Sequence, residues 1–310
     1  MTADRPLRGM LLMTGFCVLA PLGDAIAKIL GETLPLGQLL LVRFVMQAAL
    51  LTPLVLLGGG SLRLPARVLH LTILRTVLHI LGIGAMFASL RYLPLADAIA
   101  IAFVMPFLML LLGRFVLGEQ VGPYRLMACV VGFAGALLVI QPNYAAVGAP
   151  ALLPLGVAVA FALFMLVTRS VAKAADPISL QAVSGIIATI ILASIFLLGN
   201  ISGDVPGLHL VAPGRNEILL LAAVGFLGTF AHLLMTWSLR LAPAATLAPM
   251  QYLEIPFATF IGWLIFRDLP DATASLGIAL TIGSGLYVIH REQVAARKTR
   301  TLSQPLQGGA

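Results

Sequence analysis

The amino-acid sequence predicts an all-α integral membrane protein whose ten transmembrane helices form two five-helix repeats of inverted topology. Of the 310 residues, 60% are hydrophobic and 10% are charged, whereas soluble domains carry about 25% charged residues. Apolar stretches of the length that spans a bilayer recur along the chain, and its two halves resemble each other. The chain has more apolar surface than folding in water can bury, so we expect lipid to cover the rest.

Ten apolar segments follow one another, separated by short connections rich in glycine, proline and small polar residues. They are 10–30, 36–57, 69–90, 94–116, 124–141, 151–171, 178–199, 216–239, 244–266 and 273–290. The longest connection, 199–216, fits one surface loop. We therefore expect one repeat in residues 1–142, a second in 151–293, and a disordered polar cytoplasmic tail in 294–310.

The first segment follows Arg5 and Arg8, as the apolar part of a signal peptide would. It is too long for a signal peptide, no small-x-small cleavage site follows it cleanly, and the repeat needs it. We therefore interpret it as the first span.

Lysine and arginine are distributed unevenly between the two sets of connections. With the N-terminus in the cytoplasm, thirteen lie on the inner side and three, Arg91, Arg215 and Arg267, on the outer side. The positive-inside rule then predicts a protein of the cell inner membrane with both termini cytoplasmic. It also accounts for the net charge of +7, since the basic residues are not clustered with aromatic residues as in nucleic-acid binding.

The halves match at an offset of 141 near their starts, where LLMTG (11–15) meets LLPLG (152–156), and at 149 to 150 further on. SLRYLPLADA (89–98) matches SLRLAPAATL (238–247) at an offset of 149, which also relates Glu119 to Asp268, and Pro106 falls on Pro256 at an offset of 150. Five spans in each half invert the second half relative to the first. Inverted repeats are typical of secondary transporters.

Several motifs carry a family resemblance: D-x-x-x-K in the first span, an arginine in the second, and Leu-Pro-x-Ala followed by a mid-helix proline in the fourth. L-G-E closes the fourth span and G-x-x-G-x-L-L-V-I lies in the fifth. In this order, and partly in duplicate, they resemble the EamA type of the drug/metabolite transporter superfamily over about residues 10–290. Asp268 departs from the pattern, because the first half has Glu119 at that place.

The resemblance implies a basket-like pore of ten helices, with a cavity lined mainly by the first, third and fourth helices of each half. It implies a small-metabolite substrate, and D-A-I-A-K with R-F is most similar to members credited with uptake of riboflavin or S-adenosylmethionine. Export of amino acids or drugs is the alternative. We expect no cofactor and no metal, the lipid bilayer and a small molecule as partners, no nucleic acid, and a monomer or homodimer.

Charged residues inside spans mark candidate sites, because a charge at the bilayer centre costs a few kcal/mol. Asp24 and Lys28 are four residues apart, so they share a helix face and can pair. Pro21 and Gly23 are expected to kink this helix and free a carbonyl. We predict that this face lines a hydrated cavity. The alternative is a structural ion pair to another helix, with Pro21 as an ordinary bend.

The second, third and eighth spans add basic groups. Arg43 is placed to reach Asp24, and a structural role is the preferred interpretation. Arg75 and His79 share one face of the third span; Arg75 is a candidate ligand, or it extends along the helix to the inner surface. His79 and His232 are each either a binding residue or a packing residue.

Glu254 in QYLEIPF (251–257) is the deepest acid, beside Pro249 and Pro256, and Gln251 and Tyr252 add polar groups. We predict that it carries a proton or binds a cationic part of the substrate; a hydrogen bond to a neighbouring helix is the alternative. Residues near the ends of spans form predicted gate or loop pairs. These are Asp97 with Arg91, Glu119 with Arg114 or Arg125, Asp268 with Arg267, and Arg240.

A membrane enzyme is the competing interpretation. It would need a set such as H-E-x-x-H or acids clustered at one membrane face, and the sequence contains no such set. An assembly or sensor protein is disfavoured because no soluble domain is apparent. The sequence therefore predicts a transporter rather than an enzyme.

Overall fold

The computed structural model describes residues 5–116, 118, 122–201 and 209–302, and every regular element in these ranges is helical. Within these described ranges, eight helical stretches are long and apolar enough to cross a membrane, and two shorter apolar helices, Met250–Phe266 and Ala272–Tyr287, follow them. The uninterrupted helices are α1 (Pro6–Leu30), α2 (Leu36–Leu57), α3 (Ala66–Ser89), α6 (Pro123–Val147), α7 (Leu153–Val171), α8 (Pro177–Ile201), α9 (Arg215–Leu241) and α12 (Ala272–Leu302). A short 3-10 turn, Ala149–Leu152, leads into α7.

Two of the predicted spans are broken helices. The first divides into α4 (Leu95–Ala102) and α5 (Met105–Val116), and the second into α10 (Ala244–Leu247), a 3-10 turn (Ala248–Leu253) and α11 (Glu254–Phe266). Proline lacks an N–H and its ring clashes with the carbonyl four residues earlier. For Pro106 that residue is Ala102, where α4 ends, and Pro249 lies at the start of the second break.

Most helix boundaries lie close to the predicted ones, and α2 has the predicted bounds. Helix α6 ends at Val147, beyond the predicted end at residue 141. Helix α1 is continuous through Pro21. The sequence predicted a disordered tail from residue 294, and α12 is helical as far as Leu302. Residues 292–302 contain no glycine or proline and are rich in alanine, arginine, lysine and other helix formers. Residues 303–310 lie outside the described part of the chain.

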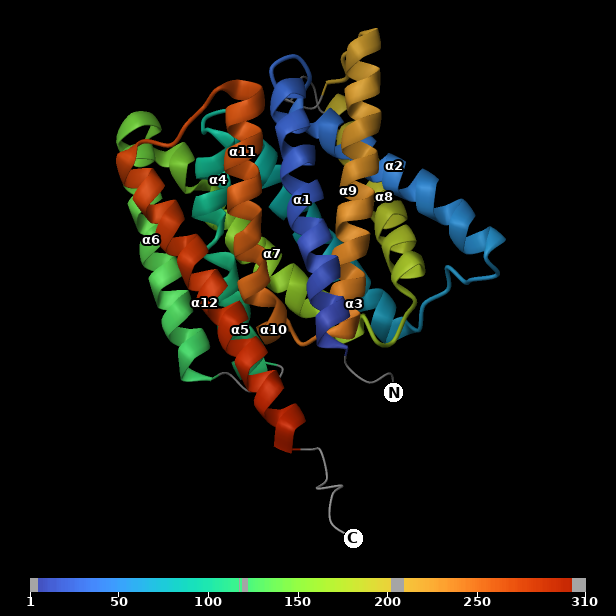
Figure 1. Ribbon diagram of the computed structural model, residues 1–310. Coiled ribbons are helices and arrows are strands. Elements are labelled where there is room, and N and C mark those ends of the chain that lie inside the picture. The colour runs from blue at the N-terminus through green and yellow to red at the C-terminus, as the bar shows by residue number, and fades with distance from the viewer. Residues whose placement is uncertain (1–4, 117, 119–121, 202–208, 303–310) are drawn as a thin grey trace.

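The helices pack so that segments from the two sequence halves alternate. Helix α1 packs along α9, α2 along α8, α3 along α7, and α6 along α12. Figure 1 shows α6 and α12 at one flank, α1 and α9 near the centre and α2 at the other flank. Helix α1 begins and α12 ends toward the same end of the molecule (Figure 1), which we call the terminal end.

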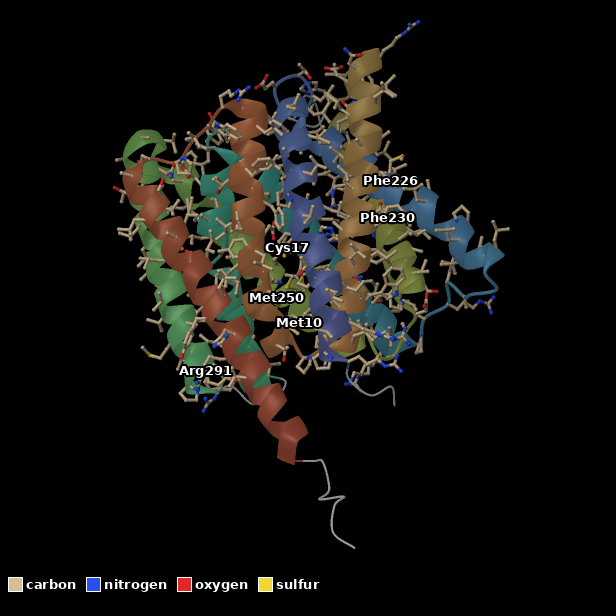
Figure 2. The ribbon with its side chains drawn as sticks, in the orientation of Figure 1. Met10, Cys17, Phe226, Phe230, Met250 and Arg291 are labelled. Carbon is tan, nitrogen blue, oxygen red and sulfur yellow. The ribbon has the colours of Figure 1, made fainter. Side chains whose placement is uncertain are left out.

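Apolar side chains cover the outside of the bundle. Figure 2 shows Phe226 and Phe230 on the outward side of α9, and Phe226 is about half exposed. Leu57 and Leu219 are even more exposed. Arg291 lies toward the terminal end, with its guanidinium carbon 5.4 Å from the ring centre of Tyr124. Such a surface is suited to contact with lipid.

Candidate functional site

A cavity lies between the packed helices, with a volume of about 60 Å³ open to the centre of a water molecule. Its wall comes from α1, α3, α4, α5, α7, α9 and α11, with Arg43 added from α2. Most of the wall is apolar, and the charged or titratable members are Asp24, Arg43, His232 and Glu254. The helices that the family resemblance predicted to line a cavity therefore do so.

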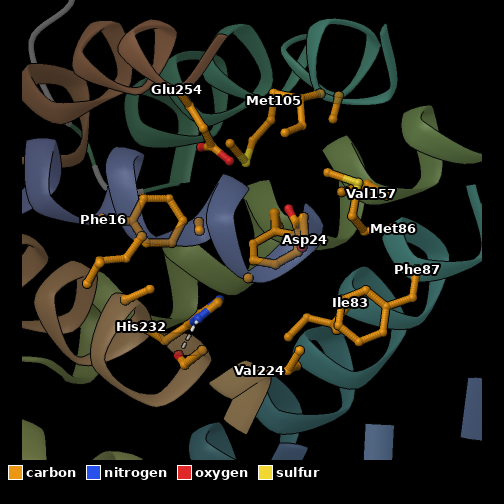
Figure 3. Close-up of a pocket in the computed structure, with 18 of the residues that line it drawn as sticks. Phe16, Asp24, Ile83, Met86, Phe87, Met105, Val157, Val224, His232 and Glu254 are labelled. Atoms are coloured by element: carbon orange, nitrogen blue, oxygen red, sulfur yellow. Dashed lines mark hydrogen bonds between the residues drawn. The ribbon is translucent and has the colours of Figure 1, made fainter. Parts of the chain in front are cut away.

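Asp24 projects into this cavity from α1 (Figure 3). Asp24 is half-buried, and among the residues that the structure describes its carboxylate has the charge of Arg43 as its neighbour and no hydrogen-bond donor. The predicted pairing with Lys28 is wrong. Lys28 Nζ lies 3.5 Å from Asp268 Oδ2 and donates to the Leu93 carbonyl at 3.1 Å. Lys28 lies one helical turn after Asp24, nearer the end of α1. Its long side chain extends to the polar connection that contains Asp268 and does not enter the cavity.

Arg43 is buried, and its guanidinium faces the cavity from α2. Its Nη2 lies 3.1 Å from His232 Nδ1, which also lies 3.0 Å from the Gly228 carbonyl oxygen. The ring nitrogen accepts from Arg43 when the proton is on Nε2, and donates to Gly228 when the proton is on Nδ1. Arg43 interacts electrostatically with Asp24 without coming within ion-pair distance, and in the described chain its Nη1 has no hydrogen-bond partner.

Glu254 begins α11 after the broken segment and also reaches the cavity wall, where its charge interacts with that of Asp24. The neighbouring candidates do not line the cavity. Gln251 places Nε2 2.8 Å from the Met165 sulfur, and the ring of Tyr252 packs at 5.5 Å from that of Phe103. The broken helix thus presents one carboxyl group to the cavity and turns its other polar side chains into the protein.

Arg75 and His79 lie outside the cavity wall, deeper in the protein. Arg75 is 0% exposed and donates to Thr168 Oγ1 at 3.0 Å and to Ser184 Oγ at 2.7 Å. It therefore does not extend to the inner surface, which was one of the two predicted interpretations. The ring of His79 stacks on Phe164, with the ring centres 4.5 Å apart.

The predicted pairs near the ends of the spans differ from those in the structure. Asp97 on α4 faces α6 and accepts a hydrogen bond from Asn143 Nδ2 at 2.9 Å. Its predicted partner Arg91, in the connection after α3, donates instead to the Leu34 carbonyl at 3.2 Å. Each residue pairs with the segment that packs opposite it in the folded protein. Spacing along the chain does not show which segment that is.

Asp268 pairs with Lys28 and not with its neighbour Arg267, whose guanidinium carbon lies 5.8 Å from the Trp263 ring centre. Arg240 Nη1 lies 4.0 Å from Asp176 Oδ1. Glu119, and with it the predicted pair to Arg114 or Arg125, lies outside the described residues.

Sequence reasoning missed the neutral polar residues around Arg75. Gln181 Nε2 donates to the His232 carbonyl at 2.8 Å and to Thr236 Oγ1 at 3.0 Å, and Gln47 Nε2 donates to the Gln181 carbonyl at 2.8 Å. A glutamine within an apolar span could have indicated these residues, because a buried side-chain amide needs hydrogen-bond partners. Gln47 lies one turn after Arg43, on the same helix face.

Comparison with known proteins places the chain among transporters. Residues 7–141 and 149–289 each match the EamA-like transporter family. The chain belongs to the EamA-like transporter family. A riboflavin transporter of Rhizobium johnstonii is 33% identical to this EamA-like chain over 246 residues, which cover 78% of this chain and 76% of that protein.

Two further relatives are similar over most of their length. A riboflavin transporter of Brucella anthropi is 27% identical over 250 residues, 81% of this EamA-like chain and 87% of the relative. An S-adenosylmethionine uptake transporter of Rickettsia prowazekii is 23% identical over 277 residues, 89% of this chain and 90% of the relative. A solved structure titled "Crystal structure of protein" aligns with a TM-score of 0.65 at 20% identity, over 96% of this chain and 98% of the other, so the two share a fold.

Proposed function

We propose that this EamA-like protein takes up a small polar metabolite that contains a flat aromatic ring, of the riboflavin or S-adenosylmethionine class, through the cavity. One observation carries the proposal: Asp24 and Arg43 enter the same aromatic-lined cavity from different helices and do not form an ion pair. Charged groups in apolar surroundings need partners, and a polar substrate supplies them. The names of the similar transporters support this substrate class.

The apolar wall suits the ring of such a substrate. It includes the phenylalanines at 16, 87, 103 and 161 and the methionines at 86 and 105. Aromatic rings and thioethers pack favourably on flat aromatic ligands. Arg43 Nη1, which has no described partner, is available to donate to a carbonyl or carboxylate, and Asp24 to accept from an N–H or O–H group.

Uptake by purified protein in liposomes tests the proposal, with riboflavin followed by its fluorescence and S-adenosylmethionine by radiolabel. We expect saturable uptake of at least one compound, reduced at least tenfold by Asp24→Asn or Arg43→Gln. Asp176→Asn is the matched control, because Asp176 is remote from the cavity and paired with Arg240. Uptake no greater than in empty liposomes rejects this substrate class. Release of amino acids from preloaded liposomes would favour the exporter alternative.

Proton coupling is a second part of the proposal. Two carboxyl groups, Asp24 and Glu254, share the cavity, and intramembrane acids commonly mark proton pathways. We expect an inward-directed proton gradient to accelerate uptake, and Glu254→Gln to abolish that acceleration. Equal rates with and without the gradient, or an unchanged gradient dependence in Glu254→Gln, would reject coupling through Glu254.

The membrane topology also belongs to the proposal. We infer ten spans in two inverted repeats, residues 1–142 and 151–293, in the cell inner membrane with both termini cytoplasmic. Support comes from the two family matches, from the start of α1 and the end of α12 at one end of the molecule (Figure 1), and from the excess of basic residues expected on that side. Reporters fused before Met1 and after Ala310 should both be active only in the cytoplasm.

One chain supplies every residue of the cavity wall, so we propose that the monomer is the transporting unit. Liposomes reconstituted at one chain per vesicle should then retain uptake. Loss of uptake at that dilution, with recovery at two chains per vesicle, would assign transport to the dimer.

A further inference from the structure

A layer of buried side chains separates the cavity from the terminal end of the molecule. Along α3, the cavity residues Ile83 and Met86 come after Arg75 and His79. Along α7 the order is reversed: Phe161 lines the cavity, and Phe164 and Thr168 follow toward the end of the helix. Helix α3 begins toward the terminal end (Figure 1), and Arg75 near its start bonds to Thr168 near the end of α7, so the two helices are antiparallel. Both orders therefore place the layer between the cavity and the terminal end.

The centre of this layer is a column of stacked groups. The guanidinium carbon of Arg75 lies 4.7 Å from the ring centre of Phe164, and Phe164 stacks on His79 at 4.5 Å. His79 lies 4.3 Å from His232 between ring centres, and His232 contacts Arg43 at the cavity wall. Within the described residues, neither ring nitrogen of His79 has a hydrogen-bond partner.

Hydrogen bonds around the column join the first sequence half to the second. Arg75 on α3 donates to Thr168 on α7 and to Ser184 and Gln181 on α8, the last at 3.4 Å. Thr76 Oγ1 donates to Ser184 Oγ at 3.0 Å. If the two halves separate on this side, these are the bonds that must break.

The hydrogen-bond acceptors of Arg75 are neutral, which makes it easier for the two halves to separate at this layer. Within the described residues, the hydrogen bonds of the fully buried Arg75 go only to neutral hydroxyl and amide oxygens. Hydrogen bonds between two ionised groups are stronger than those to neutral acceptors, and a buried ion pair is costly to break. Neutral acceptors therefore hold the arginine in place while leaving it easier to release than a carboxylate would.

We propose that Arg75 is the positioning residue of a barrier that closes the cavity toward the terminal end, and that opening this end breaks its bonds to Thr168, Ser184 and Gln181. The proposal rests on the transport function, since a transporter must open its cavity to each side in turn. Arg75 does not touch the substrate in this role. It holds the aromatic and histidine column across the path.

A cysteine reporter tests the barrier without any substrate. Thr72 is fully buried one turn before Arg75 and bonds only within its own helix, to the Val68 carbonyl. In full-length protein carrying Cys17→Ala and Cys129→Ala, in lipid nanodiscs, Thr72→Cys is exposed to a water-soluble maleimide. We expect slow labelling with Arg75 present, and labelling at least tenfold faster in Arg75→Met. Arg75→Lys, which keeps the charge but loses the planar donor geometry, should fall between them.

A second reporter separates barrier opening from general loosening. Ala188 on α8 is fully buried in the apolar core, and Ala188→Cys should be labelled equally slowly with and without Arg75→Met. Unchanged labelling of Thr72→Cys, or equal acceleration at both reporters, would overturn the proposal by making Arg75 an ordinary packing residue.

A milder variant covers the case in which Arg75→Met does not fold. Thr168→Val removes one acceptor of Arg75 and should also accelerate labelling of Thr72→Cys. Thr189→Val is its matched control, because Thr189 bonds only to its own helix. No acceleration in Thr168→Val in that case would reject the barrier. If Thr72→Cys responds as expected but riboflavin and S-adenosylmethionine are not taken up, the barrier stands and only the substrate assignment fails.

Discussion

The guanidinium of Arg43 lies against the Cα of Gly228: a Cβ built on this glycine would lie 2.6 Å from Nε and 2.7 Å from Nη2 of Arg43. No side chain can occupy that space while Arg43 stays where it is. The glycine on α9 therefore lets the arginine from α2 reach both His232 and the cavity.

Gly228→Ala is expected to displace Arg43 and leave the fold intact, because the atoms in the way are the far end of a flexible side chain. The loss of the contact with His232 should lower the transport efficiency for riboflavin or S-adenosylmethionine about tenfold, equivalent to about 1.4 kcal/mol. Initial uptake rates in liposomes over a range of substrate concentrations measure this change.

Gly23→Ala is the matched control for that substitution. Gly23 also lines the cavity, but its Cβ would meet the nearest atom, Leu227 Cβ, at an ordinary contact distance of 3.8 Å. Equal losses in the two variants would show that added bulk in the cavity, and not the position of Arg43, decides the effect.

A disulfide between positions 76 and 184 should lock the barrier shut. The hydroxyl oxygens of Thr76 and Ser184 lie 3.0 Å apart, so Thr76→Cys and Ser184→Cys together are placed to cross-link α3 to α8. In a background without Cys17 and Cys129, oxidation should reduce uptake at least tenfold and dithiothreitol should restore it. Thr76→Cys alone should be insensitive to oxidation, and full uptake by the cross-linked protein would refute the lock.

Gly135→Ala is expected to destabilise the packing of α6 on α12. Its Cβ would lie 2.5 Å from the Gly277 carbonyl oxygen, and backbone cannot move aside cheaply. Overpacking typically costs about 1–3 kcal/mol, which should lower the thermal midpoint in detergent. Gly283→Ala on α12, where nothing lies within 4 Å of the added Cβ, should leave the midpoint unchanged or raise it.

The Lys28–Asp268 pair should contribute little by itself. Its side chains are 17% and 40% exposed, and exposed ion pairs are worth about 0–1 kcal/mol. In a double-mutant cycle of Lys28→Met and Asp268→Asn, unfolding free energies in detergent should give a coupling below about 1 kcal/mol. Lys28→Met alone should cost more than Asp268→Asn, because Lys28 also binds the Leu93 carbonyl and packs over Phe266. A coupling of several kcal/mol would instead make the pair a strong lock between α1 and the connection after α11.

The sequence by itself determined the helices and their approximate ends, because the length of an apolar run and the positions of glycine and proline act locally. The break before Pro106 is an example, because the proline ring clashes with the carbonyl four residues earlier, at Ala102, where α4 ends. The motifs also sufficed to identify the EamA family. The polar and titratable residues within spans were the candidate binding residues. Four of them, Asp24, Arg43, His232 and Glu254, line the cavity, and Lys28, Arg75, His79, Gln251 and Tyr252 do not.

Only the tertiary structure decided which polar groups meet. Arg43 reaches His232 across 189 residues of sequence, Lys28 reaches Asp268 across 240, and Arg75 reaches Ser184 across 109. Spacing along one helix shows which side chains share a face, but the partner of that face depends on which helix packs opposite. In an interleaved bundle that partner comes from the other half of the chain, so neighbouring residues such as Asp24 and Lys28 form different contacts.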